Sequence, residues 1–99
     1  MHTTLKTTAK KHKLTLSGEI GFAETNALWD TAQQIAQQPK ETQIDWSNLN
    51  RIHYAGVQTL FALRRTLEEQ GYKLQFGEPN PYLYQQLHTL GVWDALIQS

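Results

Sequence analysis

The side chains that could perform nucleophilic or metal chemistry are few in this sequence and are not arranged for it. None of the three serines has glycines two residues away on both sides, as a nucleophile elbow requires; they are Ser17, Ser47 and Ser99. The four histidines are scattered and no cysteine accompanies them; they are His2, His12, His53 and His88. Because zinc sites need clustered ligands, we expect neither a catalytic residue nor a metal.

Phosphate-binding loops are also missing. The stretch Gly18-Glu19-Ile20-Gly21 lacks the full glycine fingerprint of a dinucleotide site, and no loop ends in Gly-Lys-Ser or Gly-Lys-Thr. We expect these two glycines to shape the connection into the first helix. The sequence therefore predicts no cofactor and no enzyme. A nucleotide-binding or hydrolytic enzyme stays as the alternative from another class, and it would need a phosphate site that the sequence does not display.

The composition narrows the class of protein further. The chain has 99 residues, nine Lys and Arg against nine Asp and Glu, and no cysteine. A zero net charge argues against a nucleic-acid binder that follows phosphates by charge alone. We expect residues 1–99 to form a single domain without disulfides, in the cytoplasm. No apolar run is long enough to span a membrane, and the first eight residues are too polar for a signal peptide.

One local charge cluster stands near the amino terminus. Lys6, Lys10, Lys11 and Lys13 occur with no acidic residue before Glu19. Such lysines could hold an acidic partner or a lipid headgroup. They could also simply protect an edge strand from aggregation, which is the interpretation that the sequence alone favours.

Hydropathy periodicity indicates alternating strands and helices. Residues 13–17, 42–46 and 72–76 alternate apolar with polar side chains, and a polar strand over residues 4–9 could pair with the first of them. Apolar spacings of three and four predict helices over residues 23–37 and 54–70. A polar loop at residues 47–50 is predicted between the strand 42–46 and the second helix. Asn80 and Pro81 predict the start of a third helix, which ends at Gly91 before a short helical turn over residues 92–97.

This order predicts an α/β fold. Strands connected by helices imply crossovers and a largely parallel sheet. Because each strand alternates, we expect helices on one face and a partly solvated opposite face. The prediction is a two-layer domain with a mixed, mostly parallel four-stranded sheet and helices on one face.

Three motifs in order resemble those of the STAS domain, the fold of anti-sigma-factor antagonists, and the resemblance covers residues 13–97. Residues 16–20, Leu-Ser-Gly-Glu-Ile, resemble the family's opening strand with its Gly-Glu signature. Asp45 falls on the family's acidic residue after the central strand. His53-Tyr54-Ala55-Gly56 occupies the place of the family's Asp-Ser-Ser-Gly motif.

The resemblance implies a module that docks to another protein and is switched by phosphorylation of the serine before the motif's glycine. Ala55 stands at that position, so it is a degenerate phosphorylation position that lacks a hydroxyl. We therefore expect constitutive docking. The predicted partner-binding residues are Arg51, His53, Tyr54, Ala55 and Gln58, beside residues 18–22. Asp45 and Gly56 are predicted to be structural.

Several partners are compatible with this resemblance. The first is an anti-sigma factor, commonly of the kinase type; others are a chemotaxis signalling component and the ATPase of a lipid-transport ABC transporter. None of these involves nucleic acid or a membrane-spanning segment in this chain. Trp29 and Trp93 lie in apolar patterns, which predicts either core packing or a contact between two copies in a homodimer.

Overall fold

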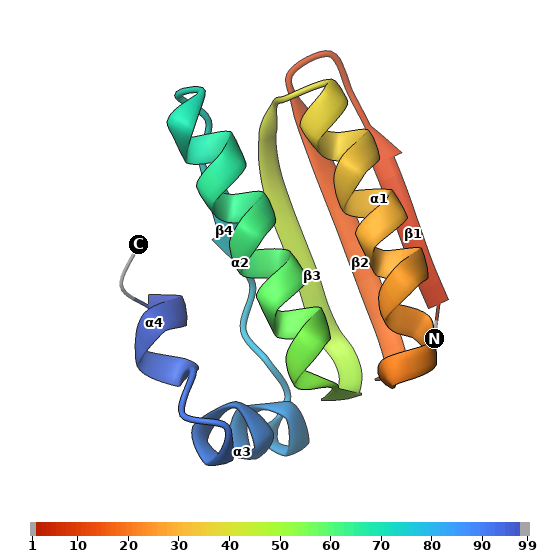
Figure 1. Ribbon diagram of the computed structural model, residues 1–99, viewed down its shortest axis with the longest axis vertical. Helices are drawn as coiled ribbons and strands as arrows, with labels where there is room; N and C mark the ends of the chain where they lie inside the picture. Colours follow the sequence, from red (N-terminus) through yellow and green to blue (C-terminus); the bar gives the residue numbers. More distant parts are fainter. Residues whose placement is uncertain (1, 98–99) are drawn as a thin grey trace.

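The described part of the chain, residues 2–97 of this computed structural model, forms one sheet with helices packed on one face (Figure 1). The strands are β1 (His2–Thr7), β2 (Lys11–Ile20), β3 (Glu41–Ile52) and β4 (Leu74–Phe76). A short 3-10 turn, η1 (Phe22–Glu24), precedes the helices α1 (Thr25–Gln37), α2 (Tyr54–Glu69), α3 (Pro81–Thr89) and α4 (Trp93–Ile97). The strand order is β1-β2-β3-β4, with β1 antiparallel to β2 and the other pairs parallel. The predicted mixed, mostly parallel sheet is confirmed.

The two faces of the sheet differ as the alternation predicted. Helices α1 and α2 pack against each other and cover one face (Figure 1), where Leu14, Leu16 and Ile44 are fully buried. On the opposite face Lys13 and Gln43 are exposed to solvent. Within residues 2–97 no helix combines the length and the apolar character that crossing a bilayer requires.

The loop predicted at residues 47–50 is wrong, because β3 continues through it to Ile52. The buried side chains in this stretch are Trp46, Leu49 and Ile52, spaced by three residues instead of two. The register against β2 shifts twice. Thr15 pairs with Asp45 and Ser17 with Asn48, so β2 advances by two residues while β3 advances by three. Gly18 pairs with Leu49 and Glu19 with Arg51, so β3 again carries one residue more. Two bulges therefore hide the strand's alternation from any two-residue pattern search.

Gly18 lies at the second bulge, on the strand opposite the extra residue. Its φ of 80° lies in the left-handed region, which glycine enters without a steric penalty. The prediction that Gly18 shapes the connection into the first helix is wrong: the residue lies within β2, which runs on to Ile20. Gly21 does lie in that connection, as the residue preceding η1.

Side-chain amides cover the outer edge of the second half of β3. Strand β4 pairs only with Thr42 to Ile44, so the following backbone groups have no strand beside them on that edge. Asn80 Nδ2 donates to the carbonyl oxygens of Ser47 at 3.1 Å and Leu49 at 2.9 Å. The same residue's Oδ1 accepts from Leu83 N and so caps α3. Asn80 thus joins the start of α3 to the unpaired strand edge.

Two further sequence predictions need correction. Strand β1 ends at Thr7, not at residue 9, because Thr8 turns the chain by bonding through its N–H to Lys11 O. Trp29 does not enter the core: its side chain is 47% exposed on α1, whose buried stripe is Leu28, Ala32 and Ile35. A contact of Trp29 with a second copy stays a prediction. Trp93 is half-buried against the rings of Tyr84 and His88.

Candidate functional site

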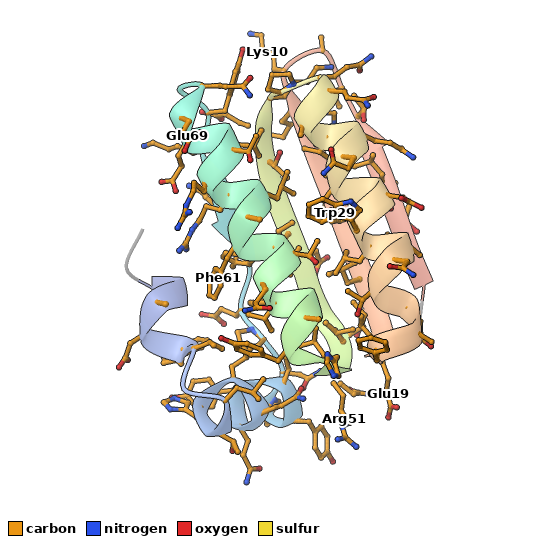
Figure 2. The ribbon with its side chains drawn as sticks, viewed as in Figure 1. Lys10, Glu19, Trp29, Arg51, Phe61 and Glu69 are labelled. Carbon is orange, nitrogen blue, oxygen red and sulfur yellow. The ribbon has the colours of Figure 1, made fainter. Side chains whose placement is uncertain are left out.

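The start of α2 lies where the carboxyl ends of β2 and β3 meet. This edge is where open α/β sheets place their binding sites. His53 N donates to Ile20 O at 2.7 Å, which ties the connection after β3 to the end of β2. Figure 2 shows Arg51 and Glu19 projecting from this end, far from Lys10 at the other. We call this end, with Phe22 and residues 51–58, the α2 tip.

His53 caps helix α2. Its backbone is extended, with φ −66° and ψ 148°, and its Nδ1 accepts a hydrogen bond from Ala55 N at 3.0 Å. A side-chain acceptor at this position satisfies one of the helix's free N–H groups. The His53 ring also meets the Phe22 ring edge-on, with centroids 5.4 Å apart. The imidazole therefore holds both the helix start and the preceding turn in position.

The structure brings the predicted partner-binding residues together at the α2 tip. Arg51, His53, Tyr54 and Gln58 are exposed, whereas Ala55 is half-buried in the first turn. Tyr54 is 47% exposed and Phe22 is 73% exposed, so two aromatic rings face solvent at one end of the molecule. Phe22 was expected only as part of a neighbouring loop. Its exposure could not be read from the sequence, because Phe22 stands between Gly21 and Ala23 outside any periodic apolar pattern.

No accessible serine or threonine hydroxyl replaces the missing one in the first turn of α2. The nearest in the helix belongs to Thr59, which is buried, and its Oγ1 donates to Ala55 O at 2.9 Å. The first turn of α2 therefore offers the Ala55 methyl group and no accessible serine or threonine hydroxyl.

A shallow depression of about 320 Å³ lies beside Tyr54. The ends of β2 and β3 form one wall, and Gln86 of α3 with Leu90, which follows α3, forms the other. Both Gln86 and Leu90 were absent from the predicted site. The signal for Gln86 was present in the sequence, since it is a polar residue next to Leu87 on the apolar side of a helix.

Gln86 binds the last residue of β3 through both atoms of its amide. Its Oε1 accepts from Ile52 N at 2.8 Å and its Nε2 donates to Ile52 O at 2.9 Å. This pairing imitates a neighbouring strand and satisfies two partly buried backbone groups. It also anchors α3 next to the residue that precedes His53.

Gly56 permits close packing of α2 on the sheet. It is buried, and a Cβ added there would lie 3.0 Å from Ile52 Cγ1 and 3.2 Å from Ile52 Cδ1. Ile52 is fully buried and has little room to move aside. A larger residue at this position would therefore push the helix start away from β3.

Asp45 does not belong to the α2 tip. It lies inside β3, not after it, because the strand extends beyond residue 46. Its Oδ1 accepts from Ser47 N at 3.2 Å and from Ser47 Oγ at 2.9 Å, which braces the first bulge. These two hydrogen bonds, backbone first, lower the pKa of the Asp45 carboxyl; burial opposes them weakly, and the positive charge of Lys13 assists.

Metal chemistry finds no support in the described residues. Residues 2–97 contain no group of three or more His, Asp or Glu side chains placed to hold an ion. What the tip can do chemically is present two aromatic rings, a guanidinium and a helix start to another molecule.

Comparisons with known proteins point in one direction. A protein-family model described as "Mlab, STAS domain" matches residues 3–98. Among solved structures, an anti-sigma factor antagonist from Mycobacterium paratuberculosis is similar with a TM-score of 0.75 at 19% identity, covering 97% of this chain and 82% of that one. The anti-sigma factor antagonist SpoIIAA in its unphosphorylated form gives 0.73 at 16% identity, covering 88% and 82%.

The phosphorylated form of the Bacillus cell fate determinant SpoIIAA is similar too, with a TM-score of 0.73 at 16% identity, covering 92% of this chain and 85% of that one. At such low identities these likenesses establish the fold. In the comparison with curated proteins, no sequence matches this chain.

Proposed function

This chain belongs to the STAS domain family, and from that premise we propose that it is a non-enzymatic module that docks a regulatory protein through the α2 tip without serine phosphorylation. The observation that carries the proposal is the pair of exposed rings, Phe22 and Tyr54, beside a helix start that has no accessible serine or threonine hydroxyl. Aromatic side chains next to an arginine are the residues that dominate binding energy at protein interfaces.

The rigidity of the tip supports constitutive docking. Helix α2 is capped by His53, and Gln86 holds the end of β3 from the other side. A surface that is already ordered loses little conformational freedom when a partner binds. The sequence resemblance implies a switch by phosphorylation of a serine at the position of Ala55, which has no hydroxyl to carry a phosphate.

The partner of first choice is an anti-sigma factor of the kinase type, in the cytoplasm. A chemotaxis component or the ATPase of an ABC transporter is the alternative partner for the same surface. Each of the three would dock at the α2 tip, and the identity of the protein captured by this chain distinguishes them.

The proposal is tested by affinity capture from native lysate with immobilised wild type, Tyr54→Ala and Tyr72→Ala. Tyr72 is the matched control, since it is 37% exposed and precedes β4 at the amino ends of the parallel strands, opposite the α2 tip. We expect one protein to be retained by wild type and Tyr72→Ala and lost by Tyr54→Ala. For the purified pair, Tyr54→Ala should raise Kd by about 30-fold, as removal of an interface anchor does. Equal capture by all three would contradict docking at the tip.

The phosphorylation-free part has its own test. The captured partner is incubated with ATP and either wild type or Ala55→Ser. If the partner is a kinase, we expect phosphate on Ala55→Ser and none on the wild type. Phosphate found within residues 51–58 of the wild type would overturn constitutive docking while leaving the docking surface intact.

A further inference from the structure

All six lysines of this chain gather at the end of the molecule opposite the α2 tip. They are Lys6, Lys10, Lys11, Lys13, Lys40 and Lys73, which we call the lysine surface. Lys11 begins β2, and Lys40 and Lys73 directly precede β3 and β4. The amino ends of parallel strands meet at one edge of a sheet. Lys40 and Lys73 therefore lie at the same end as the four lysines of the β1–β2 hairpin. Figure 2 shows Lys10 and Arg51 at opposite ends of the longest dimension, which measures 34 Å.

The lysine surface is open to solvent and carries few opposing charges. All of its side chains are exposed except Lys40, which is half-buried and donates from Nζ to Thr8 O at 2.8 Å. The acidic groups near it are Glu41, which lies between Lys11 and Lys73 in the sheet, Glu69 at the end of α2, and Asp45 beside Lys13. Positive charge therefore predominates at this end of a chain whose formal net charge is zero.

One pair within the surface is unfavourable for the folded protein alone. Lys6 lies directly opposite Lys13 in the antiparallel pairing of β1 and β2. Like charges at directly opposite positions destabilise a sheet. Lys6 on the edge strand β1 can discourage pairing with another sheet, but Lys13 lies on the inner strand β2 and has no such role. A like-charge pair that costs stability at an inner strand is a mark of a functional surface, and here an anionic ligand would remove the repulsion.

We propose that the lysine surface binds the headgroups of an anionic lipid bilayer. Lysine is a compact charge suited to a diffuse anionic surface, and clusters of four to eight basic side chains are typical of such peripheral contacts. Tyr72, which precedes Lys73 and is 37% exposed, adds a ring of the amphipathic kind found at the level of lipid headgroups.

An acidic protein or a nucleic acid fits this end less well. A protein interface needs aromatic or apolar anchors, but the most exposed rings of the described residues, Phe22 and Tyr82, lie on η1 and α3. Nucleic-acid recognition favours arginine, yet the three arginines lie on β3 and α2. The lysine surface has much positive charge and little apolar area, and an anionic bilayer surface can be bound by charge alone.

The test is co-sedimentation of the whole chain with vesicles of phosphatidylcholine alone or with about one third phosphatidylglycerol. We expect binding only to the anionic vesicles, and weaker binding as salt rises. Lys6→Gln should weaken it about fivefold, the contribution expected of one lysine near such a surface. Arg65→Gln removes the same charge from the exposed side of α2 and should bind as the wild type does.

Three readouts keep the test decisive. Thermal unfolding should show Lys6→Gln unchanged or higher in Tm by up to about 2 °C, because the Lys6–Lys13 repulsion is relieved, so its weaker binding is not a folding defect. Millimolar inorganic phosphate should not release the protein from the vesicles. Release would show that the lysine surface holds a discrete phosphate group and would overturn binding to the bilayer surface. Equal binding to neutral vesicles, no binding to anionic ones, or equal losses in Lys6→Gln and Arg65→Gln would each overturn the proposal.

Discussion

Single side chains at the α2 tip carry the proposed docking without phosphorylation. His53 caps the helix through Nδ1, and so the cap does not require a negative charge at that position. Ala55 has no hydroxyl, and Tyr54 contributes a ring that is 47% exposed. At this scale the helix start is held by an uncharged cap and offers aromatic and methyl groups, as the proposed docking requires.

Asp45 supplies a prediction at the same scale. Its pKa is lowered in the folded state by the Ser47 hydrogen bonds, so its ionised form stabilises the fold above the ordinary value of 3.8, and this contribution is lost as pH falls through the folded-state pKa. Asp45→Asn should therefore be less stable than the wild type near neutrality, by about 0.5 kcal/mol or less because the carboxylate is accessible to solvent. The gap should close on acidification, which urea unfolding between about pH 3 and pH 7 would measure.

Ser47→Ala serves as the companion variant, since it removes the hydroxyl that binds Asp45 and leaves the Ser47 backbone N–H in place. It should reduce the pH dependence without abolishing it. A gap between Asp45→Asn and the wild type that stays constant across this pH range would show that the carboxylate charge does not brace the bulge.

Helix α3 and strand β3 act as one unit through side-chain amides. Asn80 and Gln86 take the place of a strand along the half of β3 that β4 does not reach. The position of the candidate site therefore depends on a helix that contributes little to its exposed surface.

Gln86→Ala tests this coupling. It leaves Ile52 N–H and C=O without their partners in a partly buried place, which should lower the free energy of unfolding by about 1 to 3 kcal/mol. Gln85→Ala, at the exposed neighbouring position on α3, should change it by less than about 0.5 kcal/mol. Urea denaturation of the two variants measures the difference, and equal losses would show that the amide bridge contributes nothing specific.

The whole molecule separates two kinds of surface along its longest dimension. The carboxyl ends of the parallel strands lead to the aromatic α2 tip, and the amino ends carry the lysine surface (Figure 2). Opposite placement would let a protein and a bilayer be bound at the same time.

Independence of the two ends is a prediction at this scale. Tyr54→Ala should weaken partner capture and leave vesicle binding within about twofold of the wild type, and Lys6→Gln should do the reverse. In the double variant the two losses should add, as they do for distant sites without shared contacts. Co-sedimentation of the captured partner with anionic vesicles measures both at once, and loss of vesicle binding in Tyr54→Ala would argue for a single continuous interface.

The sequence by itself determined the fold class, the helices and the missing hydroxyl at Ala55, because amphipathic periodicity, capping residues and residue identity are local properties. Only the tertiary structure decided that β3 runs through residues 47–50, because its two bulges show themselves in the register against β2. The Gln86 bridge to Ile52 and the meeting of Lys40 and Lys73 with the hairpin lysines were likewise decided in three dimensions. The bulges, the amide bridge and the lysine surface all depend on which distant segments lie next to one another. Strand pairing decides those neighbours, and the spacing of residues along the chain does not reveal them.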